Sequence, residues 1–456
     1  MIYSRLTSKT SAELRGCFSQ FKADDAGGLS PGKEDNAEMW KTNRKAGGAF
    51  VVNRLYDLII IGAGAAGLFA AANAPSNQKI LLLEKTSRVG QKLYMAGGGQ
   101  CNLTNDADIK TFLTRYGANG RLLRPVLFPF SNRALMSWFE ARGLPLVVRE
   151  DGKVFPASMK SNDVIKLFTD LAAQKGVPLR LDTPVTGITP LDNGFDLQTP
   201  TERLHTRNVL VTTGGASYPQ TGSDGSFFTC LEELGIPLIP CRPALAAIHV
   251  CGYPYAALSG ISVENVALTL TAGGVAPIQG RGDLLFTHRA FSGPVILTHS
   301  RYVTDGMTLT LNYLPQRDTA ALRKTLLDAA SGDKRQLLTL LESVTTLPRR
   351  LLETICLRAT LSPDVKASHL SGAEMAQLAT LLTADIHQVS KTGGFGSAMV
   401  TAGGVALDAV DLRTMQSRAY PGLCFAGEVL DVDGDTGGYN LQFAFSSAMR
   451  AMEGVG

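Results

Sequence analysis

The sequence lacks the cysteine spacing and the long apolar runs that mark several large protein classes. Its seven cysteines are an odd number and include no Cys-x-x-Cys pair, so neither a disulfide framework nor a structural zinc site is indicated. The longest weakly polar stretch, Leu58 to Ala74, is interrupted by glycines and is shorter than the roughly 20 residues that a membrane-spanning helix requires. We therefore predict a cytoplasmic protein with no stable membrane association and no bound metal.

The sequence also has little net charge. A formal charge of +4 and a pI near 8.6 permit transient contact with RNA or phosphorylated cofactors, but they fall far short of a dedicated nucleic-acid-binding protein. Hydrophobic residues make up 45% of the 456 residues. That share and that length are typical of a globular protein with two or three domains.

Residues 1–54 are polar and contain no apolar stretch of the kind found in secretory signals. We interpret them as a disordered leader. A start site assigned too far upstream would look the same, because Met39 stands shortly before the first predicted strand. An organelle-targeting peptide is a third alternative, which conflicts with the acidic residues Asp24, Asp25, Glu34 and Asp35.

A strand, a helix and a second strand follow the leader. Residues 56–61 (YDLIII) predict a buried parallel strand, residues 65–74 an alanine-rich helix, and residues 79–84 (KILLLE) the next strand. Together they form a βαβ unit of about 30 residues, which is the context in which a glycine-rich turn binds a dinucleotide.

The turn of this unit reads GAGAAG. Gly62 allows a tight turn, Gly64 lets the backbone approach a pyrophosphate, and Gly67 allows close packing of the helix, whose amino terminus favours negative charge. Glu84 ends the second strand and is placed to accept hydrogen bonds from an adenosine ribose. Its acidity argues against a 2′-phosphate at that position. The pattern predicts a dinucleotide site.

The rest of the chain can be divided by its pattern of apolar, glycine and proline residues. Helices are predicted around 133–142 and 162–175, a hairpin over 184–199 and a strand over 208–213. The next segment has β-branched runs between Gly and Pro, which favours a small antiparallel barrel or sheet, and a helical segment follows it. Since the sheet pattern resumes at 397–401 and 422–426, we infer an insertion. The predicted boundaries are 1–54 for the leader, 55–240 and 391–456 for the two parts of the nucleotide-binding domain, 241–315 for the inserted β subdomain and 316–390 for the inserted helical subdomain.

Two further turns are candidates for the same site. Residues 422–439 (GLCFAGEVLDVDGDTGGY) predict a strand, a Gly-Glu turn and then a helix beginning near Asn440, whose amino terminus would favour an electron-rich cofactor edge. A structural turn with a helix cap is the alternative. Thr212 to Gly215 form a third glycine turn, for which a plain strand end is nearly as good an interpretation.

These motifs resemble the bacterial flavoproteins described as aminoacetone-oxidase-like or NAD(P)/FAD-dependent oxidoreductases, a family with bile-acid reductase-like and ribosomal RNA dihydrouridine synthase-like members. The resemblance runs from about Tyr56 to the carboxyl end. It is carried, in order, by GAGAAG, GQKLYMAGGGQCNLTN (90–105), LFTHRAFSGP (285–294), TAGGV (401–405), GEVLDVDG (427–434) and TGGYNLQFAFSSA (436–448).

The resemblance implies an α/β fold in which a Rossmann-like FAD-binding domain is interrupted by an inserted β-barrel plus a helical subdomain. The family usually has Ser, Arg and Gly where this chain has Ala96, Gln100 and Ala290, and loss of the arginine would alter flavin tuning or substrate anchoring. We predict that FAD contacts Gly62, Ala63, Gly64, Ala65, Ala66, Gly67, Glu84, Lys85, Gln91, Lys92, Gly98, Gly99, Asn102, Val185, Thr213, Gly214, Gly427, Glu428, Gly437, Gly438, Tyr439 and Asn440.

Family members act on different substrates, and a shared cofactor does not fix the substrate. Our leading hypothesis is a reductase in which NADPH or NADH reduces FAD, and the flavin passes hydride to an unsaturated acceptor such as a uridine in ribosomal RNA. No second glycine fingerprint is present, so the nicotinamide would bind transiently. The alternatives are an oxidase of a small aminoketone or amine, which a closed apolar pocket would favour, and a non-catalytic flavin-binding sensor.

Three residues are candidates for proton transfer or catalysis: Cys101, Tyr439 and His288. Cys101 has no cysteine partner nearby, so a small residue lining the flavin pocket is a better interpretation than a redox thiol. His288 lies in a polar loop, where a solvated histidine is the simpler alternative. Phosphate contacts to RNA could come from Arg281, His288, Arg289, Arg349, Arg350 and Arg358 if they share a face, although a solvated helical surface is the preferred interpretation.

Overall fold

The computed structural model describes residues 55–332 and 334–455. The predicted leader therefore lies outside the described residues. The chain begins with β1 (Leu55–Ile61), which pairs in parallel with β2 (Ile80–Leu83) on one side and with β9 (Arg203–Val211) on the other. The predicted βαβ unit is thus confirmed, with α2 (Ala65–Ala72) as its helix.

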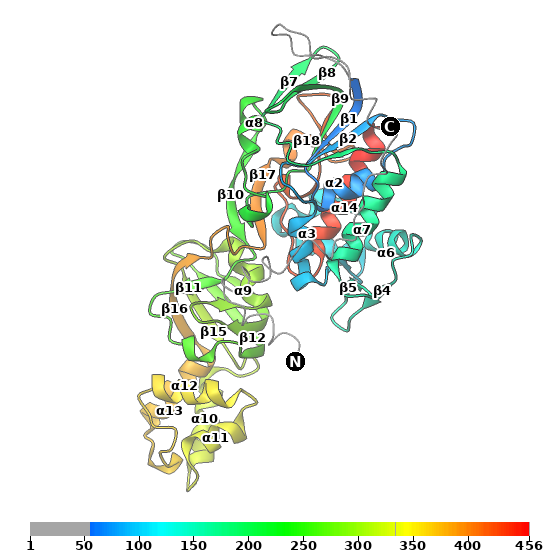
Figure 1. The fold of residues 1–456 in the computed structure, drawn as a ribbon. Helices are drawn as coiled ribbons and strands as arrows, with labels where there is room; N and C mark the ends of the chain where they lie inside the picture. The colour runs from blue at the N-terminus through cyan, green and yellow to red at the C-terminus, as the bar shows by residue number, and fades with distance from the viewer. Residues whose placement is uncertain (1–54, 333, 456) are drawn as a thin grey trace. The chain divides into compact units, whose positions relative to one another are not determined.

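These strands form the centre of a nine-stranded sheet (Figure 1). The carboxyl-terminal strand predicted at 422–426 is confirmed, since β20 (Leu423–Phe425) pairs in parallel with β9. The predicted hairpin is confirmed as β7 and β8, which joins the sheet through β9. The other sheet members are β6 (Leu179–Arg180), β7 (Gly187–Leu191), β8 (Gly194–Gln198), β18 (Val410–Asp411) and β19 (Gln416–Ser417).

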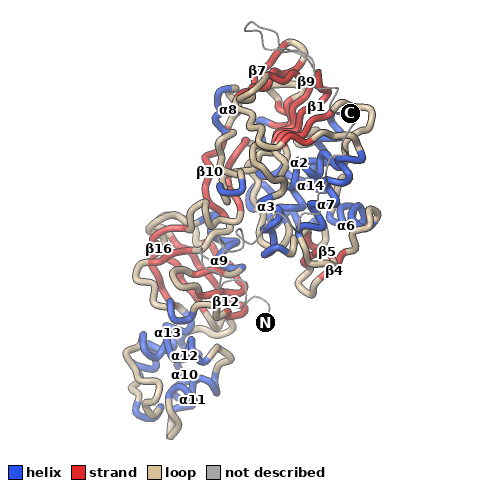
Figure 2. The backbone as a smooth tube through the Cα atoms, viewed as in Figure 1, coloured by secondary structure: helices blue, strands red, loops and turns tan. Residues whose placement is uncertain are grey.

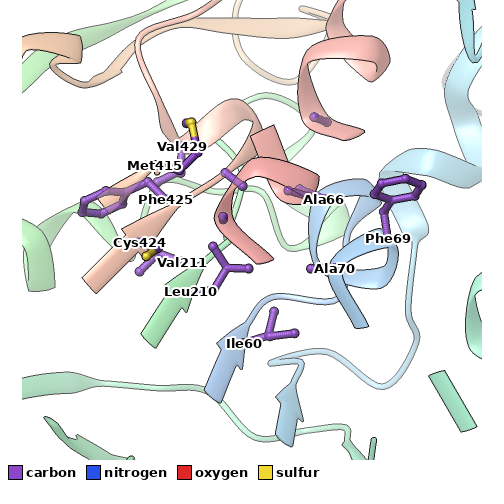
Figure 3. Close-up of a cluster of buried hydrophobic side chains, with 14 of the residues drawn as sticks. Ile60, Ala66, Phe69, Ala70, Leu210, Val211, Met415, Cys424, Phe425 and Val429 are labelled. Atoms are coloured by element: carbon purple, nitrogen blue, oxygen red, sulfur yellow. The ribbon is translucent and has the colours of Figure 1, made fainter. Parts of the chain in front are cut away.

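Helices α2, α7 (Ser161–Gln174) and α14 (Tyr439–Val455) pack beside this sheet (Figure 1). Phe69 of α2 contacts the rings of Trp138, Phe168 and Phe445. Figure 3 shows side chains of α2 in one cluster with those of β1, β9 and β20. A parallel strand that is buried on both faces needs apolar side chains along its whole length. This packing explains why β1 is almost entirely apolar.

Short elements complete this domain. A small antiparallel sheet in the order β3-β5-β4 lies outside the main sheet. Its members and the neighbouring helices are α3 (Gln91–Met95), β3 (Thr104–Asn105), α4 (Ile109–Phe112), α5 (Arg124–Leu127), α6 (Asn132–Glu140), β4 (Leu146–Val148), β5 (Lys153–Pro156) and α8 (Phe228–Glu233).

A two-stranded antiparallel ribbon leads into and out of the insertion. It consists of β10 (Leu238–Ala244) and β17 (Val400–Val405). The strand predicted at 397–401 is therefore present with shifted bounds, but it pairs with β10 and does not return to the main sheet. A strand in the ribbon and a strand in the main sheet differ only in the strand that they pair with, which is distant along the chain. The local sequence therefore cannot distinguish them.

The insertion contains a closed antiparallel barrel (Figure 2). Its strand order is β11-β14-β13-β12-β15-β16, and its interior is filled by apolar side chains from all strands. This confirms the predicted fold class. The strands are β11 (Ile248–Val250), β12 (Ser262–Thr271), β13 (Ile278–Phe286), β14 (Phe291–Ser292), β15 (Thr308–Asn312) and β16 (Asp385–Thr392), with α9 (Pro294–His299) between β14 and β15.

The helical segment lies between β15 and β16, so it is an insertion within the barrel. Strand β16 falls inside the range 316–390 assigned above to the helical subdomain, and the structure instead places it in the barrel wall, where it pairs with β11 and β15. The helices are α10 (Thr319–Ala330), α11 (Leu337–Val344), α12 (Arg349–Arg358) and α13 (Gly372–Thr383).

A buried polar group fastens α12 to the barrel. The carboxylate of Asp385, which has no exposed surface, accepts hydrogen bonds from the hydroxyls of Tyr255 (2.5 Å) and Tyr313 (2.8 Å) and lies 2.7 Å from Nη1 of Arg358. Nε2 of His387 lies 2.8 Å from Oδ2 of Asp385, the oxygen that both tyrosine hydroxyls contact, while Arg358 contacts Oδ1. We call Tyr255, Tyr313, Arg358, Asp385 and His387 the barrel cluster.

The barrel cluster has a defined charge state. Burial alone would raise the pKa of Asp385, but the hydrogen bond from His387 and the positive charge of Arg358 lower that pKa below its usual range. Burial and the neighbouring carboxylate raise the pKa of both tyrosines. Asp385 is therefore held as an anion between neutral phenols and an arginine.

Membrane helices, metal sites and cysteine pairing in the described residues bear on the class of protein. No described helix is long and apolar enough to cross a membrane. No group of His, Cys, Asp and Glu within 55–332 or 334–455 is arranged to hold a metal ion. The cysteines in these ranges are free thiols.

Candidate functional site

The glycine turn lies at the carboxyl end of β1. A Cβ atom on Gly67 would lie 1.9 Å from the carbonyl oxygen of Gly62, so the helix and the turn touch through backbone alone. Around Gly64, by contrast, a Cβ would meet nothing within 4 Å. The first turn of α2 has no side-chain cap, and its N–H groups therefore adjoin open space, as an anion site at a helix amino terminus requires.

Glu84 closes the second strand of this unit. Its carboxylate accepts hydrogen bonds from the backbone N–H of Ala63 at 2.8 Å and of Thr86 at 2.9 Å. The contact with Ala63 holds the acid directly against the glycine turn. That position is the one expected for a ribose-binding acid, and the ribose contact itself stays a prediction.

The glycine-rich loop at 96–102 packs against the start of α14. With its amide oriented to satisfy its neighbours, Asn102 accepts a hydrogen bond from the N–H of Gly438 at 3.0 Å and donates one to the carbonyl of Thr104 at 2.9 Å. A Cβ on Gly438 would lie 2.4 Å from that carbonyl oxygen. The two predicted segments therefore meet through backbone contact that only glycine permits.

An ion pair joins two other predicted segments. Nζ of Lys92 lies 2.8 and 2.6 Å from the two carboxylate oxygens of Glu428, and Oε1 of Glu428 accepts a hydrogen bond from the N–H of Thr401 at 2.9 Å. Oγ1 of Thr401 in turn accepts from the N–H of Ala216 at 2.8 Å. Sequence reasoning did not select Thr401, although it lies in the TAGGV motif.

Several predicted contact residues use their side chains within the chain. Lys85 pairs with Asp224 at 2.6 Å, and Gln91 donates to Thr86 at 2.9 Å. The Asn440 amide bonds both backbone groups of Gly434. Val185 is buried, and a Cβ on Gly214 would lie 2.9 Å from Oγ of Ser223.

These features together fit a bound flavin dinucleotide. The open space at Gly64 with uncapped N–H groups suits a pyrophosphate, and Glu84 beside it suits a ribose. A second glycine-lined helix start, at Gly437 and Gly438, lies on the same domain. We call this set of segments the flavin cradle. FAD bound there would supply hydride transfer.

Cys101 does not have the properties of a reactive thiol. Its side chain has no exposed surface, and burial raises its pKa to about 12. Nucleophilic and redox cysteines need a thiolate and access to a partner. Cys101 therefore packs in the core of the domain without the access that a redox thiol needs, and its place in the lining of the flavin pocket stays a prediction.

Tyr439 and His288 lie in different surroundings. Tyr439 is the first residue of α14 and is buried against the ring of Phe112, and burial raises the pKa of its phenol. His288 is exposed in the turn between β13 and β14, on the barrel. Cys101 and Tyr439 are the chain neighbours of Asn102 and Gly438, which are hydrogen-bonded to each other, whereas His288 lies on the barrel. The catalytic roles of all three stay predictions.

A cavity of about 350 Å³ lies between the barrel and the segment that precedes α14. Asp435 and Thr436 line it on the side of the flavin cradle, next to Gly437. Arg281 and His299 line it on the barrel side, and Arg115 lines it from the segment after α4. Nδ1 of His299 lies 2.7 Å from the carbonyl of Val295, which can only accept, so Nε2 is the nitrogen left for other contacts.

A second cluster of arginines and aspartates adjoins this cavity, and two of its members line it. Arg301 donates to the carbonyl of Asp433 at 2.8 Å and to Oδ1 of Asp435 at 2.9 Å, and its Nε lies 3.1 Å from Oδ2 of Asp433. Nη1 of Arg115 lies 3.7 Å from Asp435. We call Arg115, Arg301, Asp433 and Asp435 the cavity cluster.

Burial raises the pKa of both Asp433 and Asp435 above the usual range, against the opposing effect of Arg301. One buried arginine cannot compensate two neighbouring carboxylates fully, and Asp431 adds a third negative charge nearby. Oδ2 of Asp433 is within ion-pair distance of Nε of Arg301 but makes no hydrogen bond. The cavity cluster can therefore exchange a proton at a higher pH than an ordinary aspartate would.

Sequence reasoning missed the cavity cluster and His299. The acids are spaced at every second position in DVDGD (431–435), immediately before the glycine pair, and that pattern could have singled them out. Arg301 and Arg115 carry no such signal. Arg301 lies 132 positions from Asp433 along the chain and Arg115 lies 320 positions from Asp435, so only the fold brings them together.

The cradle, its glycine turns and the adjoining cavity define a flavin-dependent oxidoreductase of the Rossmann class. The comparison with known families agrees: residues 56–454 match the model of the HI0933-like protein Rossmann domain. The chain belongs to this family and is an FAD-dependent oxidoreductase.

Relatives of known name differ in substrate. The chain is 31% identical over 405 residues to the ribosomal RNA dihydrouridine synthase of Escherichia coli, covering 86% of this chain and 96% of the relative. It is 28% identical over 403 residues to the 3-dehydro-bile acid delta(4,6)-reductase of Clostridium scindens, covering 86% and 97%. The solved 3-ketosteroid-delta4-(5alpha)-dehydrogenase from Rhodococcus jostii RHA1 is similar at 16% identity and a TM-score of 0.48, covering 89% and 97%.

Proposed function

We propose that this protein is an NAD(P)H-driven reductase that saturates a carbon–carbon double bond conjugated to a carbonyl, with a uridine of ribosomal RNA as its acceptor. The observation that carries the proposal is the polar and cationic lining of the cavity beside the flavin cradle. The relative named ribosomal RNA dihydrouridine synthase, similar over almost its full length, supports the choice of acceptor.

The chemistry of such a reduction matches the groups that line the cavity. NAD(P)H, a proton and uridine give NAD(P)⁺ and dihydrouridine. When hydride adds to one carbon of the double bond, negative charge develops on the conjugated carbonyl oxygen. Arg115 and Arg281 are placed to stabilise that charge, as preorganised cationic donors do. His299 is the candidate to deliver the proton to the other carbon, from Nε2 of its doubly protonated imidazolium form; it is left as the neutral imidazole with Nδ1–H on the Val295 carbonyl and takes up a new proton from solvent.

The same lining bears on the alternatives. A small-amine oxidase would be favoured by a closed apolar pocket, whereas this cavity is lined by Arg115, Arg281, His299 and Asp435. An acidic steroid enone is a second candidate acceptor, because two arginines can bind a carboxylate and a bile-acid reductase is among the relatives.

The test is a pair of half-reactions followed in the absence of oxygen. The purified yellow protein is mixed with NADPH or NADH, and the flavin absorbance is recorded. Ribosomal RNA from a strain lacking the gene, a bile-acid enone or buffer is then added. We expect bleaching by the nicotinamide, and recovery of absorbance with RNA accompanied by dihydrouridine.

Other results would contradict the proposal. Recovery with the bile-acid enone alone would assign the steroid acceptor. Bleaching by an aminoketone but not by nicotinamides, with peroxide release in air, would assign the oxidase. A flavin that no donor reduces would indicate a binding protein.

A further inference from the structure

A segment without acidic residues lies beside the cavity. Residues 109–127 contain Lys110, Arg115, Arg121 and Arg124 and no Asp or Glu. We call this stretch the cationic segment. It consists of short helical turns, from α4 through two 3-10 turns to α5.

The cationic segment is rigidly attached to the flavin domain. Phe112 and Leu123 have no exposed surface, and Tyr116 is almost completely buried. The hydroxyl of Tyr116 donates a hydrogen bond to the carbonyl of Tyr439, the first residue of α14, at 2.9 Å. The apolar side of the segment thus holds it against the start of the same helix that completes the flavin cradle.

The opposite side of the segment carries its charges into solvent. Lys110, Arg121 and Arg124 are exposed, and within residues 55–332 and 334–455 none of them forms an ion pair with a carboxylate. Arg124 lies over the ring of Phe128 at 4.9 Å, which leaves its N–H donors free at the edge. Fixed cations with unsatisfied donors are the usual partners of phosphate.

The arginines of the helical segment differ in this respect. Arg349 pairs with Glu342 and Glu353, Arg350 donates to the carbonyl of Ala257, and Arg358 belongs to the barrel cluster. These contacts do not support phosphate binding by the three arginines. They agree with the preferred interpretation of a solvated helical surface, on which the arginines pair within the chain.

The cationic segment also contacts the helical turn that follows α9 and the segment that precedes α14. A Cβ on Gly117 would lie 3.3 Å from the hydroxyl of Tyr302, and Asn119 donates to the carbonyl of Asp431 at 2.8 Å. Two large apolar side chains are exposed here, Leu122 at 54% and Tyr302 at 40%. An exposed ring in contact with a segment that carries exposed cations is a combination that suits single-stranded nucleic acid, where bases stack and phosphates pair.

We propose that the cationic segment and Tyr302 form the docking surface for RNA, with phosphates on Lys110, Arg121 and Arg124 and an unpaired base on Tyr302. The inference rests on the proposed function and adds to it the surface on which the RNA would bind. A uridine inside a stacked helix cannot enter a cavity, so the acceptor must be unstacked, and its flanking nucleotides need a place to bind. The segment supplies that place next to Arg115, which lines the cavity itself.

The test compares two variants with the same loss of charge. In the first, Lys110→Gln, Arg121→Gln and Arg124→Gln remove the cations of the segment. In the matched control, Arg323→Gln, Lys324→Gln and Lys366→Gln remove three exposed cations of the helical segment. Binding of a fluorescein-labelled RNA hairpin with a uridine-containing loop is measured by anisotropy over a range of salt concentrations.

We expect the first variant to bind the hairpin at least about 10-fold more weakly near physiological salt, with a log–log salt slope reduced by about two units, and the control to bind like the unchanged protein. Tyr302→Ala should weaken binding by roughly 5- to 100-fold with little change in that slope. Flavin content and bleaching by NADPH should be unchanged in all three, which shows that they are folded.

Equal losses in both triple variants, a larger loss in the control, or an unchanged protein that does not bind the hairpin would each overturn the surface. The proposed function fails separately. If the first variant alone loses RNA but no dihydrouridine forms with the unchanged protein, the surface stands and the acceptor is wrong. If the first variant makes dihydrouridine at the unchanged rate, the surface is wrong and the function stands.

Discussion

Two arginine–aspartate clusters in this protein shift the pKa values of their carboxyl groups in opposite directions. In the barrel cluster, Asp385 faces two phenols, an arginine and a histidine, and its pKa is lowered. In the cavity cluster, Arg301 is shared between Asp433 and Asp435, and both pKa values are raised.

The difference lies in how many donors each carboxylate receives. A buried carboxylate that receives several donors is a fixed structural anion, whereas one that shares its only full cation gains little from ionising. The first arrangement fastens the helical segment to the barrel. The second leaves proton exchange available beside a cavity, which is where perturbed groups of functional sites are found.

The largest effect is expected when the barrel cluster loses its centre. Asp385→Ala leaves Arg358, whose side chain is 22% exposed, without a counter-charge, and breaking a buried pair costs about 3–5 kcal/mol, so we expect the lower end of that range. We expect that loss in the free energy of unfolding, measured with urea. The matched control is Arg349→Ala on the same helix, whose exposed ion pairs contribute about 1 kcal/mol or less. Similar losses in both variants would contradict a special role for the barrel cluster.

The next effect is expected on catalysis. Arg301→Met removes the cation shared by Asp433 and Asp435 and frees the loop that leads into the flavin cradle. Misplacement of a site by about 1 Å can cost on the order of 100-fold in rate, so we expect a 10- to 100-fold slower reoxidation of the reduced flavin by the acceptor. Stopped-flow measurement of reduction by NADPH in the same variant is the control. If reduction slows as much as reoxidation, the cavity cluster acts on the flavin and not on the acceptor.

The two clusters should also oppose each other in their response to pH. The lowered pKa of Asp385 means that its contribution to stability is present above its usual value of 3.8 and is lost as the pH falls through the lowered pKa. The raised pKa values of Asp433 and Asp435 give a contribution that is present below 3.8 and is lost as the pH rises through the raised values.

Urea unfolding at a series of pH values measures these contributions. Asp385→Asn should flatten the loss of stability on the acid side, and Asp433→Asn should reduce the decline above pH 3.8. Curves that remain parallel to that of the unchanged protein in both variants would show that neither carboxyl group titrates differently in the folded state.

The smallest effect is expected from Asp433→Asn at neutral pH. An amide resembles the neutral carboxyl toward which the pKa of Asp433 is already shifted, and Arg301 retains Asp435. We expect a change below about 1 kcal/mol in the free energy of unfolding, in contrast to the loss for the same substitution at Asp385. A loss equal to that of Asp385→Asn would remove the distinction between the clusters.

The parts of the fold that were predicted from sequence are those with strong local patterns. Residues 56–61 and 79–84 are apolar runs flanking a glycine turn, and the structure has strands there with the helix between them. The hairpin at 187–198 follows in the same way from its turn residues. Strands β16 and β17 were misassigned to other parts of the fold, because the barrel and ribbon pairings that define them are set by partners far along the chain.

The site divides similarly. Gly62, Gly67 and Glu84 were recognisable because each is required by a turn or a strand end next to it in sequence. Arg301 was not, since an isolated arginine in a short helical turn has no distinguishing neighbours. Its importance arises from a contact with Asp433, which no local pattern records. The FAD contacts and the catalytic residues remain predictions.

The position of the helical segment has an evolutionary consequence. Strands β15 and β16 are paired neighbours, and Leu311 lies opposite Asp385, so the chain leaves the barrel and returns at almost the same point. Such an insertion could in principle be gained or lost in one step without disturbing the barrel wall. Once Arg358 reached inward to Asp385, however, deletion would strand a buried anion. The helical segment is therefore an integral part of the barrel, although the chain path alone would allow its removal.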